Sequence, residues 1–128
     1  MIAPLQRVRQ PVRHRVGGDL FGVMDVLGKV VVDGSVMRRA SLKNTGGVDI
    51  HGTLYGQIET TGPVVIRGDM EKGSTVMNTG GGFVYGRLRG TFDTTGTVFV
   101  FGSIDDSARV HGGEVILIPR RDAMELEE

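Results

Sequence analysis

Residues 28–34 read GKVVVDG, and residues 62–68 read GPVVIRG. The likeness extends beyond these seven positions, because residues 28–61 align with residues 62–95 without a gap and share 13 identities. Tandem similarity at a fixed period indicates a chain built from one supersecondary unit that is used several times. The longest shared phrase is NTGG, at 44–47 and at 78–81.

The repeat continues in both directions from this central pair. VGGDLFG at 16–22 aligns with IHGTLYG at 50–56, and GTVFVFG at 96–102 begins a third block. The repeat therefore covers residues 16–118.

Each 34-residue block divides into two shorter coils. Val64, Ile66, Gly68 and Met70 alternate with polar or outward residues, and a period of two is typical of a strand. We expect one interior column of Val32, Ile50, Ile66, Val84 and Val100, a second of Leu42, Val76 and Val110, and a third of Met24, Ile58 and Phe92. Each strand opens at a glycine, and the intervals of 18, 16, 18, 16 and 17 separate Gly28, Gly46, Gly62, Gly80, Gly96 and Gly113.

Short strands that recur once in every such interval bury their apolar sides when successive coils stack. We therefore expect an all-β fold, a single right-handed parallel β-helix of six to seven rungs, and we prefer it to an antiparallel sandwich or barrel because of the strict repeat. The expected organisation is a basic N-terminal tail at 1–15, the β-solenoid at 16–119 and a charged C-terminal tail at 120–128. Glycines with positive φ are expected at the corners that follow Asn44-Thr45 and Asn78-Thr79.

Composition excludes several functional classes. Lys plus Arg and Asp plus Glu number 15 each among 128 residues, so net charge gives no reason to expect nucleic-acid binding. Cysteine is absent, which excludes disulfides and thiolate chemistry. No apolar run approaches the roughly 18 residues that span a bilayer. We expect a soluble, cytoplasmic protein.

The sequence does not suggest catalysis. His51 aligns with Tyr85 in the next repeat, so the three histidines do not form a column that could bind a metal. A hexapeptide acyltransferase would need a six-residue repeat, which the chain does not keep. We expect no enzymatic activity, no cofactor, no metal and no small-molecule substrate.

Two surface features remain. Apolar and aromatic residues occupy the outward positions of the C-terminal coils, where they predict a self-assembly surface or, alternatively, cross-strand pairs that hold the rungs in register. The first fifteen residues combine apolar and basic side chains, which predicts contact with an anionic membrane surface or with nucleic acid, unless the segment is only a disordered tail. The self-assembly candidates are Phe83, Tyr85, Phe99, Phe101, Ile116 and Ile118, and the membrane candidates are Ile2, Leu5, Arg7, Arg9 and Arg13.

These motifs carry a family resemblance. GPVVIRGDM at 62–70, KGSTV at 72–76 and FVYGRLRG at 83–90 are similar to the β-helical C-terminal domain of the septum-site division inhibitor MinC. Over residues 16–118 the chain resembles bactofilins, bacterial polymer-forming cytoskeletal proteins with one β-helix, short tails and a variable N-terminal membrane-targeting segment. The β-helical accessory domain of formylmethanofuran dehydrogenase and glutamate synthase is a third, less regular likeness.

The departures from these families separate the alternatives. The N-terminal domain of the division inhibitor and its Arg-Ser-Gly-Gln docking segment are missing from this sequence, and bactofilins carry more regular rungs than the alternation of longer and shorter coils seen here. The resemblance to bactofilins implies a non-catalytic, self-assembling scaffold in the cytoplasm, peripheral to the inner membrane. The alternatives are a dimeric adaptor that docks an ATPase and a structural subunit of an enzyme complex.

Overall fold

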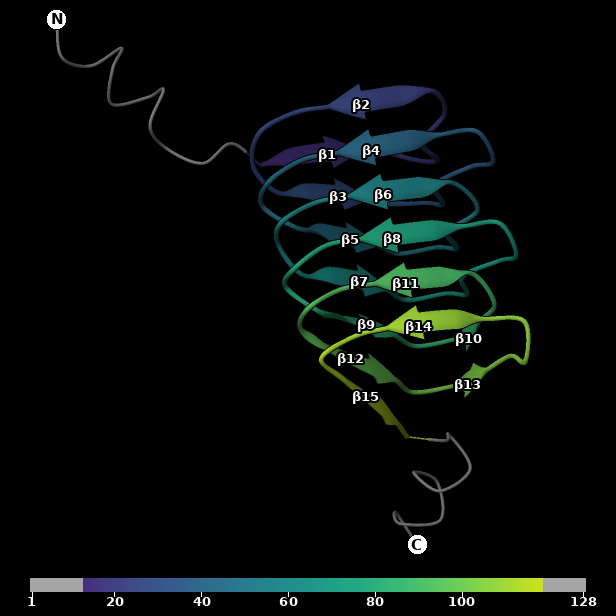
Figure 1. Cartoon of the computed structure of the whole chain (residues 1–128). Helices are drawn as coiled ribbons and strands as arrows, with labels where there is room; N and C mark the ends of the chain where they lie inside the picture. Colours follow the sequence, from purple (N-terminus) through teal and green to yellow (C-terminus); the bar gives the residue numbers. More distant parts are fainter. Residues whose placement is uncertain (1–12, 119–128) are drawn as a thin grey trace, which may run out of the picture.

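The computed structural model describes residues 13–118, and in this part of the chain all regular structure is β, with no helix. The chain winds as a right-handed coil of about six turns, with parallel strands stacked along the axis (Figure 1). The predicted β-solenoid is therefore confirmed. Its first strand begins at His14, two residues before the start that the repeat suggested.

Three ladders of parallel strands enclose the core. The seven-stranded face contains β1 (His14–Val16), β3 (Val30–Val32), β5 (Val48–Ile50), β7 (Val64–Ile66), β9 (Gly82–Val84), β12 (Thr97–Val100) and β15 (Glu114–Leu117). The six-stranded face contains β2 (Val23–Asp25), β4 (Ser41–Lys43), β6 (Gln57–Glu59), β8 (Thr75–Met77), β11 (Thr91–Asp93) and β14 (Arg109–His111). The narrow face contains β10 (Arg87–Leu88) and β13 (Ser103–Ile104), and single bridges continue it through Met70, Leu54, Val36 and Leu20.

The predicted first interior column is confirmed. Its members are in register from one strand to the next, and each has an exposed fraction of 0%. Burying a Val or Ile side chain contributes about 1.5–3 kcal/mol, so the column is a main source of stability. It consists of Val32, Ile50, Ile66, Val84 and Val100.

The prediction of two further, separate columns was wrong. Leu42 lies in register with Met24 on one side and with Ile58 on the other, so both sets alternate within the six-stranded face. The 34-residue period spans two coils, so it relates each residue to its counterpart two coils away. The prediction therefore divided one continuous ladder into two sets. The complete ladder is Met24, Leu42, Ile58, Val76, Phe92 and Val110.

The glycines at one set of corners serve close packing and not a left-handed backbone. A Cβ on Gly68 would lie 2.6 Å from the carbonyl oxygen of Gly52, which stacks on it from the preceding coil. Gly68 has no positive φ; the chain bends there from the seven-stranded to the narrow face. At the corner between the six-stranded and the seven-stranded face, the residues with positive φ are Gly47 (93°) and Gly81 (74°). Each lies one residue later than predicted.

The alternation of longer and shorter coils has one structural origin. Between the narrow face and the six-stranded face, odd coils use four positions (Leu54 to Ile58), whereas even coils use six (Val36 to Leu42). The two extra residues form a turn closed by a backbone hydrogen bond, such as Ala40 N–H to Met37 O (3.0 Å). We call residues 37–40, 71–74 and 105–108 the long corners; all three lie at the same edge of the solenoid (Figure 1).

Candidate self-assembly surface

The predicted aromatic residues stack on the outer side of the seven-stranded face. The rings of Phe83 and Phe99 lie 5.1 Å apart with an interplanar angle of 12°, and those of Tyr85 and Phe101 lie 4.9 Å apart with the same angle. Parallel in-register strands place equivalent side chains directly above one another, which explains the stacking. All four rings are half-buried. They form one continuous cluster over two rungs.

The last rung extends this cluster with aliphatic side chains. Ile116 pairs with Phe99, and the N–H of Ile118 donates a hydrogen bond to the oxygen of Val100 at 2.7 Å. Both isoleucines are half-buried. We call the six residues the aromatic patch: Phe83, Tyr85, Phe99, Phe101, Ile116 and Ile118.

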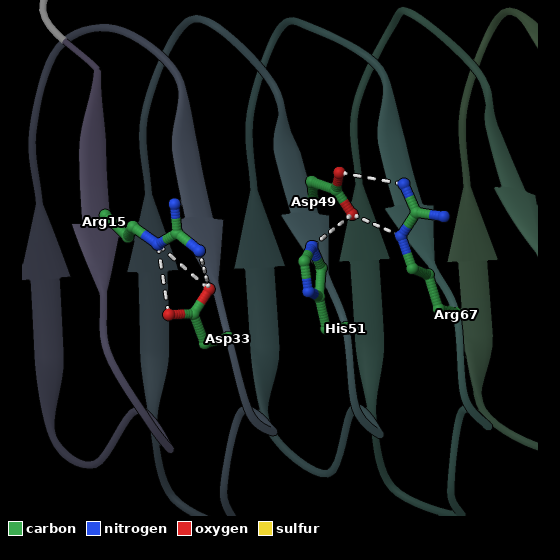
Figure 2. A network of polar contacts seen from close by, with 5 residues as sticks. All are labelled: Arg15, Asp33, Asp49, His51 and Arg67. Carbon is green, nitrogen blue, oxygen red and sulfur yellow. Dashed lines mark hydrogen bonds and ion pairs between the residues drawn. The ribbon is translucent and has the colours of Figure 1, made fainter.

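The same face carries charges in its N-terminal half. Arg15 pairs with Asp33 at 3.0 Å, and Asp49 pairs with Arg67 at 3.2 Å and approaches His51 at 3.9 Å (Figure 2). The hydrogen bond to Asp49, and then its charge, raise the pKa of Arg67 above its ordinary value. The outer surface is therefore divided into a charged half and an aromatic half.

Sequence reasoning missed the strongest apolar exposure at the C-terminal end. Val115 and Leu117 are 40% and 46% exposed, although their register partners Val98 and Val100 are at 0%. Val115 and Leu117 occupy inward positions of the last rung, and no further rung follows within residues 13–118. The signal was present, because both residues continue an interior column in the last recognisable coil.

A second apolar group lies in the first rung. Phe21, Val23 and Leu27 are 70%, 81% and 75% exposed. Val23 pairs with Ser41, so an outward position that is polar in the next coil is apolar here. This departure from the repeat could have been found by comparing the coils position by position.

The other sequence-predicted residues fall into separate places. Arg13 is exposed at the start of the described chain, whereas Ile2, Leu5, Arg7 and Arg9 lie outside the described residues. Between residues 13 and 118 no three His, Cys, Asp or Glu side chains gather where they could hold a metal ion. The same segment contains no helix long and apolar enough to cross a membrane.

The chain was compared with known families, curated proteins and solved structures, and no match was found in any of the three.

Proposed function

We propose that this protein is a non-catalytic scaffold that assembles with copies of itself, in the manner of the bactofilins that its sequence resembles. One observation carries the proposal. Interior positions become surface at the last rung, where Val115 and Leu117 expose 40% and 46% of their area. A second copy stacked on this rung would return both side chains to the environment of Val98 and Val100.

The backbone supports the same proposal. β15 has a strand neighbour only on the β12 side, and β14 only on the β11 side, among the described residues. The free edge of a strand presents N–H and C=O groups that another strand can pair. Repeat proteins that stay monomeric cover such terminal repeats with polar caps. The described part of this solenoid ends on apolar side chains instead.

The aromatic patch widens the proposed contact. It adjoins the last rung through Ile116 and Ile118, so a subunit docked at the end would meet apolar atoms on two sides of the same edge. Burial of apolar surface contributes about 25 cal/mol per Å². Exposed ion pairs contribute less than about 1 kcal/mol each. The proposed assembly is accordingly driven by apolar contact.

Within this proposal the scaffold works in the cytoplasm, next to the inner membrane. The tail with Ile2, Leu5, Arg7, Arg9 and Arg13 supplies the membrane contact, since each basic side chain near an anionic surface adds about 1 kcal/mol. The scaffold requires no cofactor, metal or small-molecule substrate. Its partners are copies of itself and the membrane surface.

The test compares two exposed apolar residues of similar accessibility. Leu117→Lys places a charge in the last rung, and Met77→Lys places one at a 49% exposed position in the middle of the six-stranded face. We expect wild type and Met77→Lys to form filaments in electron microscopy and large species in light scattering, and Leu117→Lys to remain small. Filaments of wild-type length from Leu117→Lys would overturn the end contact.

A lateral dimer, like the adaptor suggested by the similarity to the division inhibitor, is the second candidate. The stacked rings favour it, because they form a broad apolar surface along the side of the coil. Discrete two-subunit particles that Phe101→Arg converts to monomers would support this arrangement over the filament.

A further inference from the structure

Two long corners enclose a groove on the edge of the solenoid. Residues 38–41 form one wall, residues 72–73 form the other, and the short corner 55–57 of the intervening coil forms the floor. The groove has a volume of about 330 Å³, which is within the range of small-ligand sites. Its walls are two coils apart, about 10 Å at the usual strand spacing.

The groove gathers positive charge. Arg38 and Arg39 extend from the first wall and Lys72 from the second, and all three are exposed. None of them takes part in an ion pair within residues 13–118. Glu71, which precedes Lys72, is held by Arg89 of the next coil at 3.3 Å. Three cations thus border a cavity with no carboxylate among its lining residues.

This charge is not required by the fold. One repeat later, Lys72, Arg89 and Asp106 occupy the positions of Arg38, Tyr55 and Lys72. There Arg89 is neutralised by Glu71. The repeat can therefore be built with balanced charges at these positions, and the groove at Arg38 departs from that balance.

Arg39 gives a second, independent indication. It is the one non-glycine residue with positive φ in the described chain, at 74°, and its counterpart in the next repeat is Gly73, at 85°. A left-handed backbone favours glycine strongly at such a position. An arginine there places a guanidinium at the groove at the expense of local strain, and strain of this kind concentrates at binding sites.

We propose that this groove binds a phosphate group. Arginine presents a planar fork of donors that matches phosphate in two-point contacts, and lysine adds a compact charge opposite it. Tyr55 on the floor adds a phenolic hydroxyl that can donate to a phosphate oxygen. A soluble phosphate ester and a phosphorylated lipid headgroup share this chemistry.

The test uses charge-matched double variants of the full chain. Arg38→Ala/Arg39→Gly removes two groove cations. It also places glycine at the left-handed position, as in the next repeat at Gly73, so the variant should fold. Lys43→Ala/Arg109→Ala removes two cations from the outer side of the six-stranded face. Inorganic pyrophosphate, titrated calorimetrically, is the soluble probe. Sedimentation with phosphoinositide vesicles, against phosphatidylserine vesicles of equal charge, is the membrane probe.

Affinity for at least one probe should fall about tenfold or more in the groove variant, the loss expected for charge-assisted contacts, and by less than about twofold in the control. Loss with pyrophosphate identifies a soluble ester, and loss confined to phosphoinositide vesicles identifies a lipid headgroup; either supports the site. Equal losses in the two double variants, or no binding of either probe by wild type, would overturn it.

Discussion

Leu117 continues the interior column of Val100, its register partner, yet Leu117 is 46% exposed and Val100 is at 0%. The two side chains have the same orientation, and within residues 13–118 a further rung follows Val100 but none follows Leu117. In a solenoid, the residue that continues an interior column into the terminal rung is therefore as apolar as the column itself, but it is exposed. The last rung that the structure describes therefore exposes apolar side chains of the kind found in a protein core.

The interior column predicts the effect of a buried charge. Ile66→Asp would place a carboxylate at a position with 0% exposure and no polar partner, which costs several kcal/mol. We expect cooperative thermal unfolding monitored by circular dichroism to disappear. Val65→Asp, at the adjacent half-buried outward position, is the control and should fold. A cooperative transition in Ile66→Asp would contradict the column.

The aromatic patch predicts how assembly responds to salt and to charge. Apolar contacts are not screened, so assembly should persist at about 1 M NaCl, whereas surface ion pairs weaken. Phe101→Arg and Ile118→Lys should give folded, smaller species by light scattering. If both variants assemble like wild type, the patch serves only to hold the rungs in register.

The N-terminal tail predicts membrane association. Deletion of residues 1–10 removes Ile2, Leu5, Arg7 and Arg9, and should weaken sedimentation with anionic vesicles while the far-ultraviolet spectrum and the particle size stay unchanged. Neutral vesicles provide the control. Unchanged binding to anionic vesicles would exclude the tail as the membrane contact.

Two corner positions, Gly68 and Arg39, predict substitutions with opposite effects on the free energy of unfolding. Gly68→Ala would bring a methyl group 2.6 Å from the Gly52 carbonyl oxygen, and the packed backbone there cannot yield cheaply. We expect a loss of a few kcal/mol in the free energy of unfolding, since overpacking typically costs about 1–3 kcal/mol. Denaturant titration measures it, and a change below about 0.5 kcal/mol would contradict the close approach.

Arg39→Gly should instead stabilise the protein. A non-glycine residue in the left-handed region costs about 1–2 kcal/mol, and the added freedom of glycine in the unfolded chain offsets part of the gain. We expect a net increase of about 0.5–1 kcal/mol by denaturant titration. Arg38→Gly, at the adjacent position without positive φ, is the control and should not stabilise. A loss of stability in Arg39→Gly would show that the arginine makes a compensating contact.

Much of the core could be predicted because repetition and alternation both mark it. Val32, Ile50 and Ile66 occupy equivalent positions in successive coils, and each has the same place in the inward and outward alternation of its strand. The third face could not be predicted in this way. Val32, Gly34 and Val36 keep the period of two across the bend at Gly34, so alternation conceals the corner. Only the lack of room for a Cβ reveals it.

The candidate surfaces were predictable to different degrees. The aromatic patch could be predicted because its residues occupy outward positions in the alternation of each strand. In the structure its rings stack against one another. The exposure of Leu117 could be predicted only with knowledge of which described coil comes last. The basic groove requires more, because Arg38 and Lys72 belong to successive repeats and become neighbours across one coil only when both long corners lie on the same edge.

The long corners also give the coil a direction. The first coil turns from the narrow to the six-stranded face through a short corner (Leu20 to Met24), and the last does so through a long one (Ile104 to Val110). Copies joined head to tail would continue the alternation of corners across the joint without interruption. Copies joined at like ends would set two short corners or two long corners side by side. The long corners would project from one edge of the filament at intervals of about 10 Å. A sufficiently detailed image of the filament would therefore show from this spacing whether all subunits point the same way.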